Sequence, residues 1–147
     1  MSARHRLLVA TRKGLFTIID DGGWRIDGPA FRGDNVSAVL AHPGNGALYA
    51  ALDHGHFGAK LHRSTDDGAS WEEIDPPQYP PKPEHEEDWT DMHGRTIPHS
   101  LLRIWCLEAD HPQRPAGIWC GTIPGGLFHS SDGGDSWQLV EGLWNDP

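Results

Sequence analysis

The chain of 147 residues is long enough for one ordinary domain and too short for two. Its 12 lysines and arginines face 21 aspartates and glutamates, and the net charge of −9 argues against nucleic-acid partners and anionic membrane surfaces. The 18 glycines and 12 prolines interrupt the chain too often for long helices, so the composition favours an all-β fold.

No apolar run approaches the ~18 residues of a membrane span, and residues 1–10 hold too short an apolar stretch for a signal peptide. We therefore expect a cytoplasmic protein without membrane association. In that compartment Cys106 and Cys120 are expected to be reduced, buried thiols. A disulfide between neighbouring strands is the alternative.

The first predicted strands are residues 7–10 and 14–18, two apolar runs rich in β-forming side chains. A turn over residues 20–23 leads to Trp24 and a third strand. These strands make up a first expected unit, residues 5–28.

The second expected unit covers residues 34–75. An apolar run closes at the proline turn in residues 36–43, and residues 47–51 form the next strand. A third strand leads into Ser64, and a fourth begins at Trp71. Four short antiparallel strands are therefore predicted here.

A long insertion, residues 75–100, begins with a proline-rich stretch that is stiff and extended, and continues with acidic and histidine residues. Long loops without secondary structure inside compact domains are usually functional or disordered. With His54 and His56 expected nearby, its side chains suggest a cation site of mixed nitrogen and oxygen ligands. A solvated acidic loop is the alternative, because the spacing matches no known metal motif.

The third expected unit, residues 101–141, repeats the second. Residues 104–112 again close at a His-Pro turn, residues 117–121 form the next strand, and the fourth strand is expected at 137–140. One eight-residue pattern, S-x-D-x-G-x-S-W, occurs in both units, at residues 64–71 and 130–137.

Self-similar units of four short antiparallel strands are typical of propeller blades. We predict a β-propeller with about three blades present: a partial blade at 5–28 and full blades at 34–75 and 101–141. Closed propellers typically have about 4–8 blades, so the ring is expected to be incomplete. We expect an N-terminal part of a longer protein; the alternative is that copies associate through unpaired blade edges.

The octapeptides are expected to be structural fasteners. Their aspartates can accept hydrogen bonds from nearby backbone N–H groups, their glycines permit positive φ, and their tryptophans can wedge between sheets. A catalytic or calcium-binding role is the weaker alternative. The residues given the structural role are Ser64, Asp66, Gly68, Trp71, Ser130, Asp132, Gly134 and Trp137.

Both octapeptides closely resemble the Asp-box, or BNR repeat, of sialidase-like β-propellers, a superfamily that also includes sortilin-type receptors and photosystem II assembly propellers. Residues 10–16, 54–58 and 141–147 are similar to bacterial sialidase-like BNR proteins of mostly unassigned activity. The resemblance spans essentially the whole chain. It implies the propeller fold, while the superfamily includes hydrolases, binders and scaffolds.

In such a meander the octapeptides share one face, and the opposite face collects residues 11–14, 31–33, 53–58, 75–100 and 122–126. Loops on a rigid scaffold carry most binding residues, so we expect the ligand site on this loop face. The candidate ligand-binding residues are Arg12, Lys13, His54, His56, Asp91, His93 and His99. His54, His56 and His93 are also the candidate ligands of a divalent metal, the one candidate cofactor.

We expect a propeller of unassigned activity that binds a small molecule or a glycan at the loop face. A glycoside hydrolase is the first alternative, and a protein-interaction scaffold is the second. A sialidase resembling the superfamily would need an arginine cluster, an acidic proton shuttle and a tyrosine paired with glutamate. Here Tyr49 is mid-strand and Tyr79 lies among prolines, so no catalytic residue is assigned and hydrolysis is expected only of a longer protein.

Overall fold

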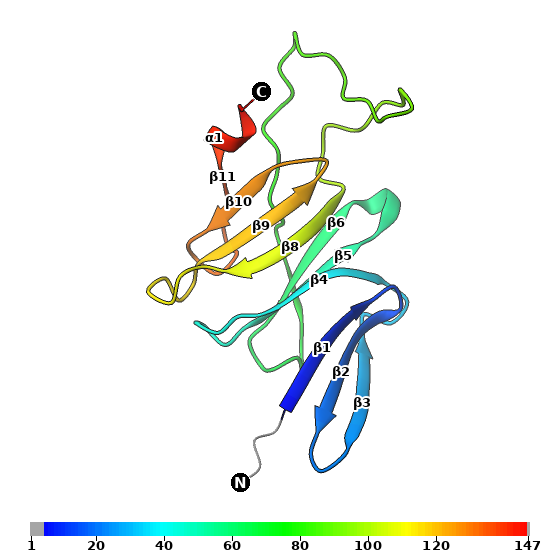
Figure 1. The fold of residues 1–147 in the computed structure, drawn as a ribbon, viewed down its shortest axis with the longest axis vertical. Helices are drawn as coiled ribbons and strands as arrows, with labels where there is room; N and C mark the ends of the chain where they lie inside the picture. Colours follow the sequence, from blue (N-terminus) through cyan, green and yellow to red (C-terminus); the bar gives the residue numbers. More distant parts are fainter. Residues whose placement is uncertain (1–4, 147) are drawn as a thin grey trace.

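The computed structural model describes residues 5–146, except for the side chain of His56. The chain folds into three antiparallel sheets that form an open arc, which confirms the all-β prediction (Figure 1). The helical elements are a 3-10 turn, η1 (Gly55–Phe57), and a short helix, α1 (Glu141–Trp144). No helix in the described part of the chain is long and apolar enough to cross a membrane.

Consecutive strands pair in each sheet, so every sheet is a meander. The first sheet has the order β1-β2-β3, the second β4-β5-β6-β7 and the third β8-β9-β10-β11. The strands are β1 (His5–Thr11), β2 (Gly14–Asp20), β3 (Trp24–Ala30), β4 (Asn35–Ala41), β5 (Leu48–Asp53), β6 (Ala59–Ser64), β7 (Glu72–Ile74), β8 (Arg103–Ala109), β9 (Ile118–Ile123), β10 (Leu127–Ser130) and β11 (Gln138–Leu139).

The second sheet packs against both of its neighbours. Leu48, Ala50 and Leu52 on β5 are buried on the side of the first sheet, and Tyr49 and Ala51 are buried against the third. Strand β4 contacts both β1 and β8, so these three strands lie at the inner edge of the arc. Two hydrophobic cores therefore lie on either side of one sheet.

Two equivalent β-bulges distort the inner strands. The register with the next strand shifts between Val36 and Ala38 on β4 and between Ile104 and Cys106 on β8, leaving Ser37 and Trp105 as the extra residues. The bulge changes the alternation on β8, so that Ile104 faces the core and Cys106 is exposed. The expectation that both thiols are buried is thus wrong for Cys106, while Cys120 is buried; both are free.

The two octapeptide turns have the same hydrogen-bond network. In the first, Ser64 Oγ donates to Asp66 Oδ1 at 2.8 Å and accepts from Gly68 N at 2.8 Å, while Ser70 N donates to the same carboxylate. In the second, Ser130 and Asp132 make the equivalent bonds. Trp71 and Trp137 lie between the turn and the following strand, so β7 and β11 each begin one residue later than predicted.

Each octapeptide turn also binds the preceding sheet. Arg63 Nη1 on β6 donates to Gly133 O at 3.0 Å, and Tyr49 Oη donates to the same carbonyl at 2.9 Å. At the equivalent position of the first turn, Arg6 on β1 contacts the carbonyl and the carboxylate of Asp67. The turns therefore connect one sheet to the next.

The insertion extends away from the sheets and packs back on the third sheet and α1 (Figure 1). The Tyr79 ring stacks on Phe128 at 5.9 Å between centroids and contacts Trp144 at 5.1 Å. Trp89 lies 5.7 Å from Trp144 and 4.2 Å from His99. Aromatic packing fixes the base of the insertion.

Candidate functional site

The loop face is built at one end of the inner strands. The β1–β2 turn and the β3–β4 loop are joined there, since Gly33 N donates to Lys13 O at 3.1 Å. The Thr11 hydroxyl shapes the tight turn by accepting from Lys13 N. Gly14 closes it at φ 127°, where a Cβ would lie 2.6 Å from Ala30 O. Arg12 and Lys13 are therefore held on a rigid turn.

A hollow of about 460 Å³ lies between the ends of β1, β4 and β8. Both β-bulges supply a lining residue, Ser37 from β4 and Trp105 from β8, and Trp105 is 66% exposed. Bulges often redirect side chains beside functional sites. The full lining is Ala10, Thr11, Arg12, Asn35, Val36, Ser37, Arg103 and Trp105.

Arg103 is fixed in this hollow by an ion pair. Its Nε and Nη2 donate to Asp53 Oδ2 at 3.0 Å and 2.5 Å, across 50 residues of sequence. Burial alone would raise the pKa of Asp53, but the hydrogen bonds from Arg103 and from Gly55 N outweigh it and lower that pKa. Asp53 is therefore a carboxylate that orients the guanidinium.

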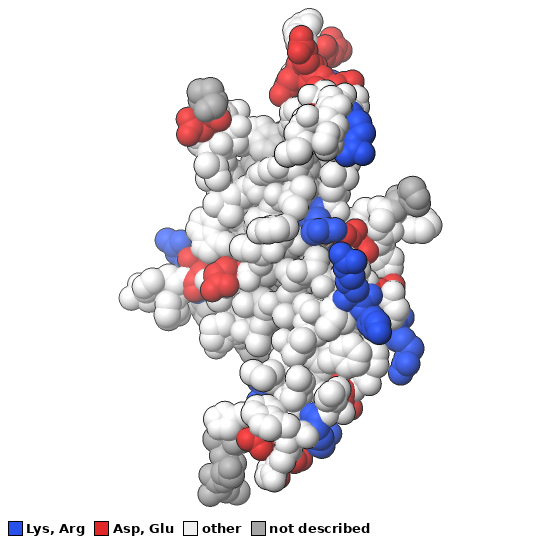
Figure 2. Space-filling model, turned by 45° about the vertical axis from the view of Figure 1, so that its right-hand side comes forward, with Lys and Arg blue, Asp and Glu red and all other residues white. Residues whose placement is uncertain are grey.

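Other cations at this face have no such partner. Arg12, Lys13 and Arg32 are exposed and form no ion pair with any residue that the structure describes. Figure 2 shows several lysine and arginine side chains along one side of the molecule; the largest group of acidic side chains is at the top, and others are scattered over the view. A chain of net charge −9 thus presents a local cationic surface.

His54 directly follows Asp53 at the end of β5. Its Nε2 is buried, 3.8 Å from Asp34 Oδ2, and has no hydrogen-bond partner among the described residues. The neighbouring His62 is half-buried against Phe31, and burial lowers its pKa. The side chain of His56, the other predicted histidine, lies outside the described part of the structure.

Asp91 and His93 lie in a separate turn of the insertion. The Asp91 carboxylate accepts from His93 N at 2.8 Å and from Arg95 N at 2.9 Å, and it pairs with the Arg95 guanidinium. Hydrogen bonds from Arg95 lower the pKa of Asp91. Neither residue lines the hollow that contains Arg12. This carboxylate shapes its own turn.

His99 lies in the aromatic base of the insertion. Its Nε2 is 3.1 Å from Pro80 O, and it lines a hollow of about 370 Å³ together with Phe57 from η1. Among the residues that the structure describes, no three His, Cys, Asp or Glu side chains are close enough to hold a metal ion.

The structure thus brings Arg12 together with residues that sequence reasoning missed, while Lys13 lies on the adjacent turn outside the hollow. Arg103, Trp105, Ser37 and Asn35 belong to this site because they begin the inner strands β4 and β8. The sequence did contain a signal for them. Residues 36–43 and 104–112 repeat the same strand, so the first residues of the two strands are expected to lie together at the inner edge.

No family model matches the chain, and no curated protein matches it. A solved structure described as YCF48 bound to D1 peptide is similar in fold, with a TM-score of 0.53 at 16% sequence identity. The match covers 92% of this chain and 37% of that one, so this chain spans little more than a third of its length. YCF48 is a β-propeller, and the chain accordingly has the fold of an incomplete β-propeller with blade-like sheets.

Proposed function

We propose that the loop face binds an anionic small molecule or an acidic sugar of a glycan. The observation that carries this proposal is the hollow at the inner strand ends, where Arg12 and the fixed Arg103 lie beside the exposed ring of Trp105. Guanidinium groups recognise carboxylates and phosphates, and an exposed indole offers a face on which a sugar ring can pack.

We further propose that the chain belongs to the sialidase-like Asp-box propellers. Its support is the shared network in the two octapeptide turns, where Ser64 and Ser130 make the same pair of bonds. This proposal assigns glycoside hydrolysis only to a longer protein and not to these 147 residues alone. Tyr49 is fully buried, and the Tyr79 hydroxyl is bonded to Thr122 Oγ1 at 2.9 Å, so both phenols have structural contacts.

Isothermal titration with N-acetylneuraminic acid and with the neutral N-acetylglucosamine tests the first proposal. We expect the acidic sugar to bind more tightly and its affinity to fall with added salt. Arg12→Gln, which removes a cation from the lining of the hollow, should weaken it several-fold. Arg114→Gln is the matched control, because Arg114 is exposed in the β8–β9 turn and absent from the hollow. Equal affinity for both sugars, or an equal effect of Arg12→Gln and Arg114→Gln, would contradict the proposal.

A peptide with acidic side chains is the second candidate ligand. The similar structure of YCF48 is bound to a D1 peptide, and Arg32 is a further exposed cation outside the hollow here. A ligand of this kind should lose affinity in Arg32→Gln, whereas a small anion in the hollow should not.

A further inference from the structure

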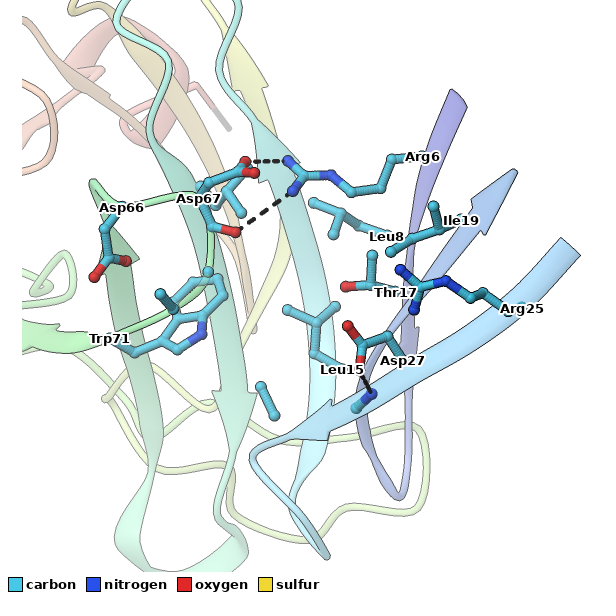
Figure 3. Close-up of a pocket in the computed structure, with 15 residues that line it drawn as sticks. Arg6, Leu8, Leu15, Thr17, Ile19, Arg25, Asp27, Asp66, Asp67 and Trp71 are labelled. Atoms are coloured by element: carbon cyan, nitrogen blue, oxygen red, sulfur yellow. Dashed lines mark hydrogen bonds and ion pairs between the residues drawn. The ribbon is translucent and has the colours of Figure 1, made fainter. Parts of the chain in front are cut away.

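A larger cavity, of about 770 Å³, lies between the first sheet and the octapeptide turn of the second sheet (Figure 3). One wall is the face of the first sheet with Leu8, Leu15 and Thr17, and the other contains Gly68 and Trp71. It is separate from the loop face. Its volume lies within the ~300–1,000 Å³ typical of small-molecule sites.

The corresponding place between the second and third sheets is filled by protein. A Cβ built on Gly134 would lie 2.9 Å from Ile74 Cδ1 and 3.6 Å from Tyr49 Cε1, both on the preceding sheet. At Gly68, the equivalent glycine, a Cβ would meet Leu48 at 3.5 Å and Trp71 at 3.9 Å, both on its own sheet. The cavity therefore occupies the position that the Tyr49 ring takes in the other interface.

The two interfaces also differ in their polar contacts. Trp137 Nε1 donates to Asp75 O at 3.1 Å. The equivalent Trp71 Nε1 is buried and has no partner among the described residues. Figure 3 shows the Trp71 indole N–H on the side of the ring that faces the cavity. A buried donor without an acceptor is costly, so a ligand oxygen at this point would be favoured.

The first-sheet side of the cavity also carries polar groups. Thr17 on β2 and Arg25 and Asp27 on β3 lie together there, opposite Trp71 (Figure 3). A ligand can therefore carry polar substituents at this end, while its ring packs against Leu8 and Leu15.

We propose that this cavity binds a small planar aromatic molecule that carries an oxygen acceptor, in the manner of a phenol. The ring would lie in the space that has no counterpart of the Tyr49 ring, turned so that its oxygen accepts from Trp71 Nε1. The proposal does not depend on ligand binding at the loop face.

Titration of ¹⁵N-labelled protein with p-cresol, the free form of a tyrosine side chain, tests this proposal. We expect the Trp71 indole N–H resonance to shift and that of Trp137 to stay in place. Toluene, which lacks the oxygen, should bind about 3–10-fold more weakly, the equivalent of one hydrogen bond. Equal affinity for both compounds, or no shift of the Trp71 resonance, would overturn the proposal.

Thr17→Phe should place a ring in the space opposite Trp71 and abolish the p-cresol shift, and Thr17→Val, which keeps the size of the side chain, is the matched control. Retained p-cresol binding in a folded Thr17→Phe protein would overturn the proposal. If Thr17→Phe does not fold, the comparison of p-cresol with toluene on the unmodified protein still tests whether the cavity binds a phenol through its oxygen.

Discussion

Ser130 is the best position at which to measure what an octapeptide turn contributes to stability. The side chain is 1% exposed, and its Oγ both accepts from Gly134 N and donates to Asp132 Oδ1 at 2.8 Å. Ser130→Ala leaves the buried Gly134 N–H without its acceptor. A buried group left unpaired costs about 1–3 kcal/mol, so we expect the free energy of unfolding to fall by that amount.

Urea unfolding, followed by tryptophan fluorescence, measures this loss. With a denaturant dependence of about 1–3 kcal/mol/M for a small protein, a loss of about 2 kcal/mol lowers the midpoint by roughly 1 M. Ser131→Ala is the matched control, since Ser131 is the exposed neighbour in the same turn. The reasoning fails if the two variants unfold at the same urea concentration.

Three further predictions concern other groups in the fold. In the native protein Cys106 should react with a thiol reagent, while Cys120, whose pKa burial raises to about 12, should react only after unfolding; two fast thiols would contradict this. Hydrogen bonds led by that from the Ser136 hydroxyl lower the pKa of Asp132 to about 2, so its stabilising effect should be complete above about pH 4 and lost as the pH falls through 2. Carboxyl NMR titration checks this, and an unchanged midpoint in Ser136→Ala would refute the assigned cause. Tyr49→Phe should cost about 1–2 kcal/mol in the same urea assay, because the lost hydroxyl joins two sheets; wild-type stability would show that this bond contributes nothing.

The architecture could be predicted from the sequence because its signals are local. Each octapeptide contains the groups that satisfy its own turn, as Ser64 and Asp66 do within a few residues. Apolar runs and proline turns likewise mark strands from neighbouring residues alone. The all-β propeller prediction rests on these short-range patterns.

The candidate site could be predicted only in part, because its contacts are long-range. Arg103 and Asp53 are far apart in sequence and meet only once two sheets are packed. The bulge at Trp105 has no sequence signal, and it alone moved Cys106 from the expected core to the surface. Asp91 was selected as a binding residue by its type, yet its carboxylate is used by its own turn.

The burial of β5 on both faces also bears on how the molecule loses structure. Ala50 and Ala51 are adjacent in the chain but belong to different cores. The second sheet therefore cannot loosen without opening both cores, whereas the first sheet, with the largely exposed β3 at its edge, can separate by breaking only one. Partial unfolding should accordingly spread inward from the first sheet and reach β5 last.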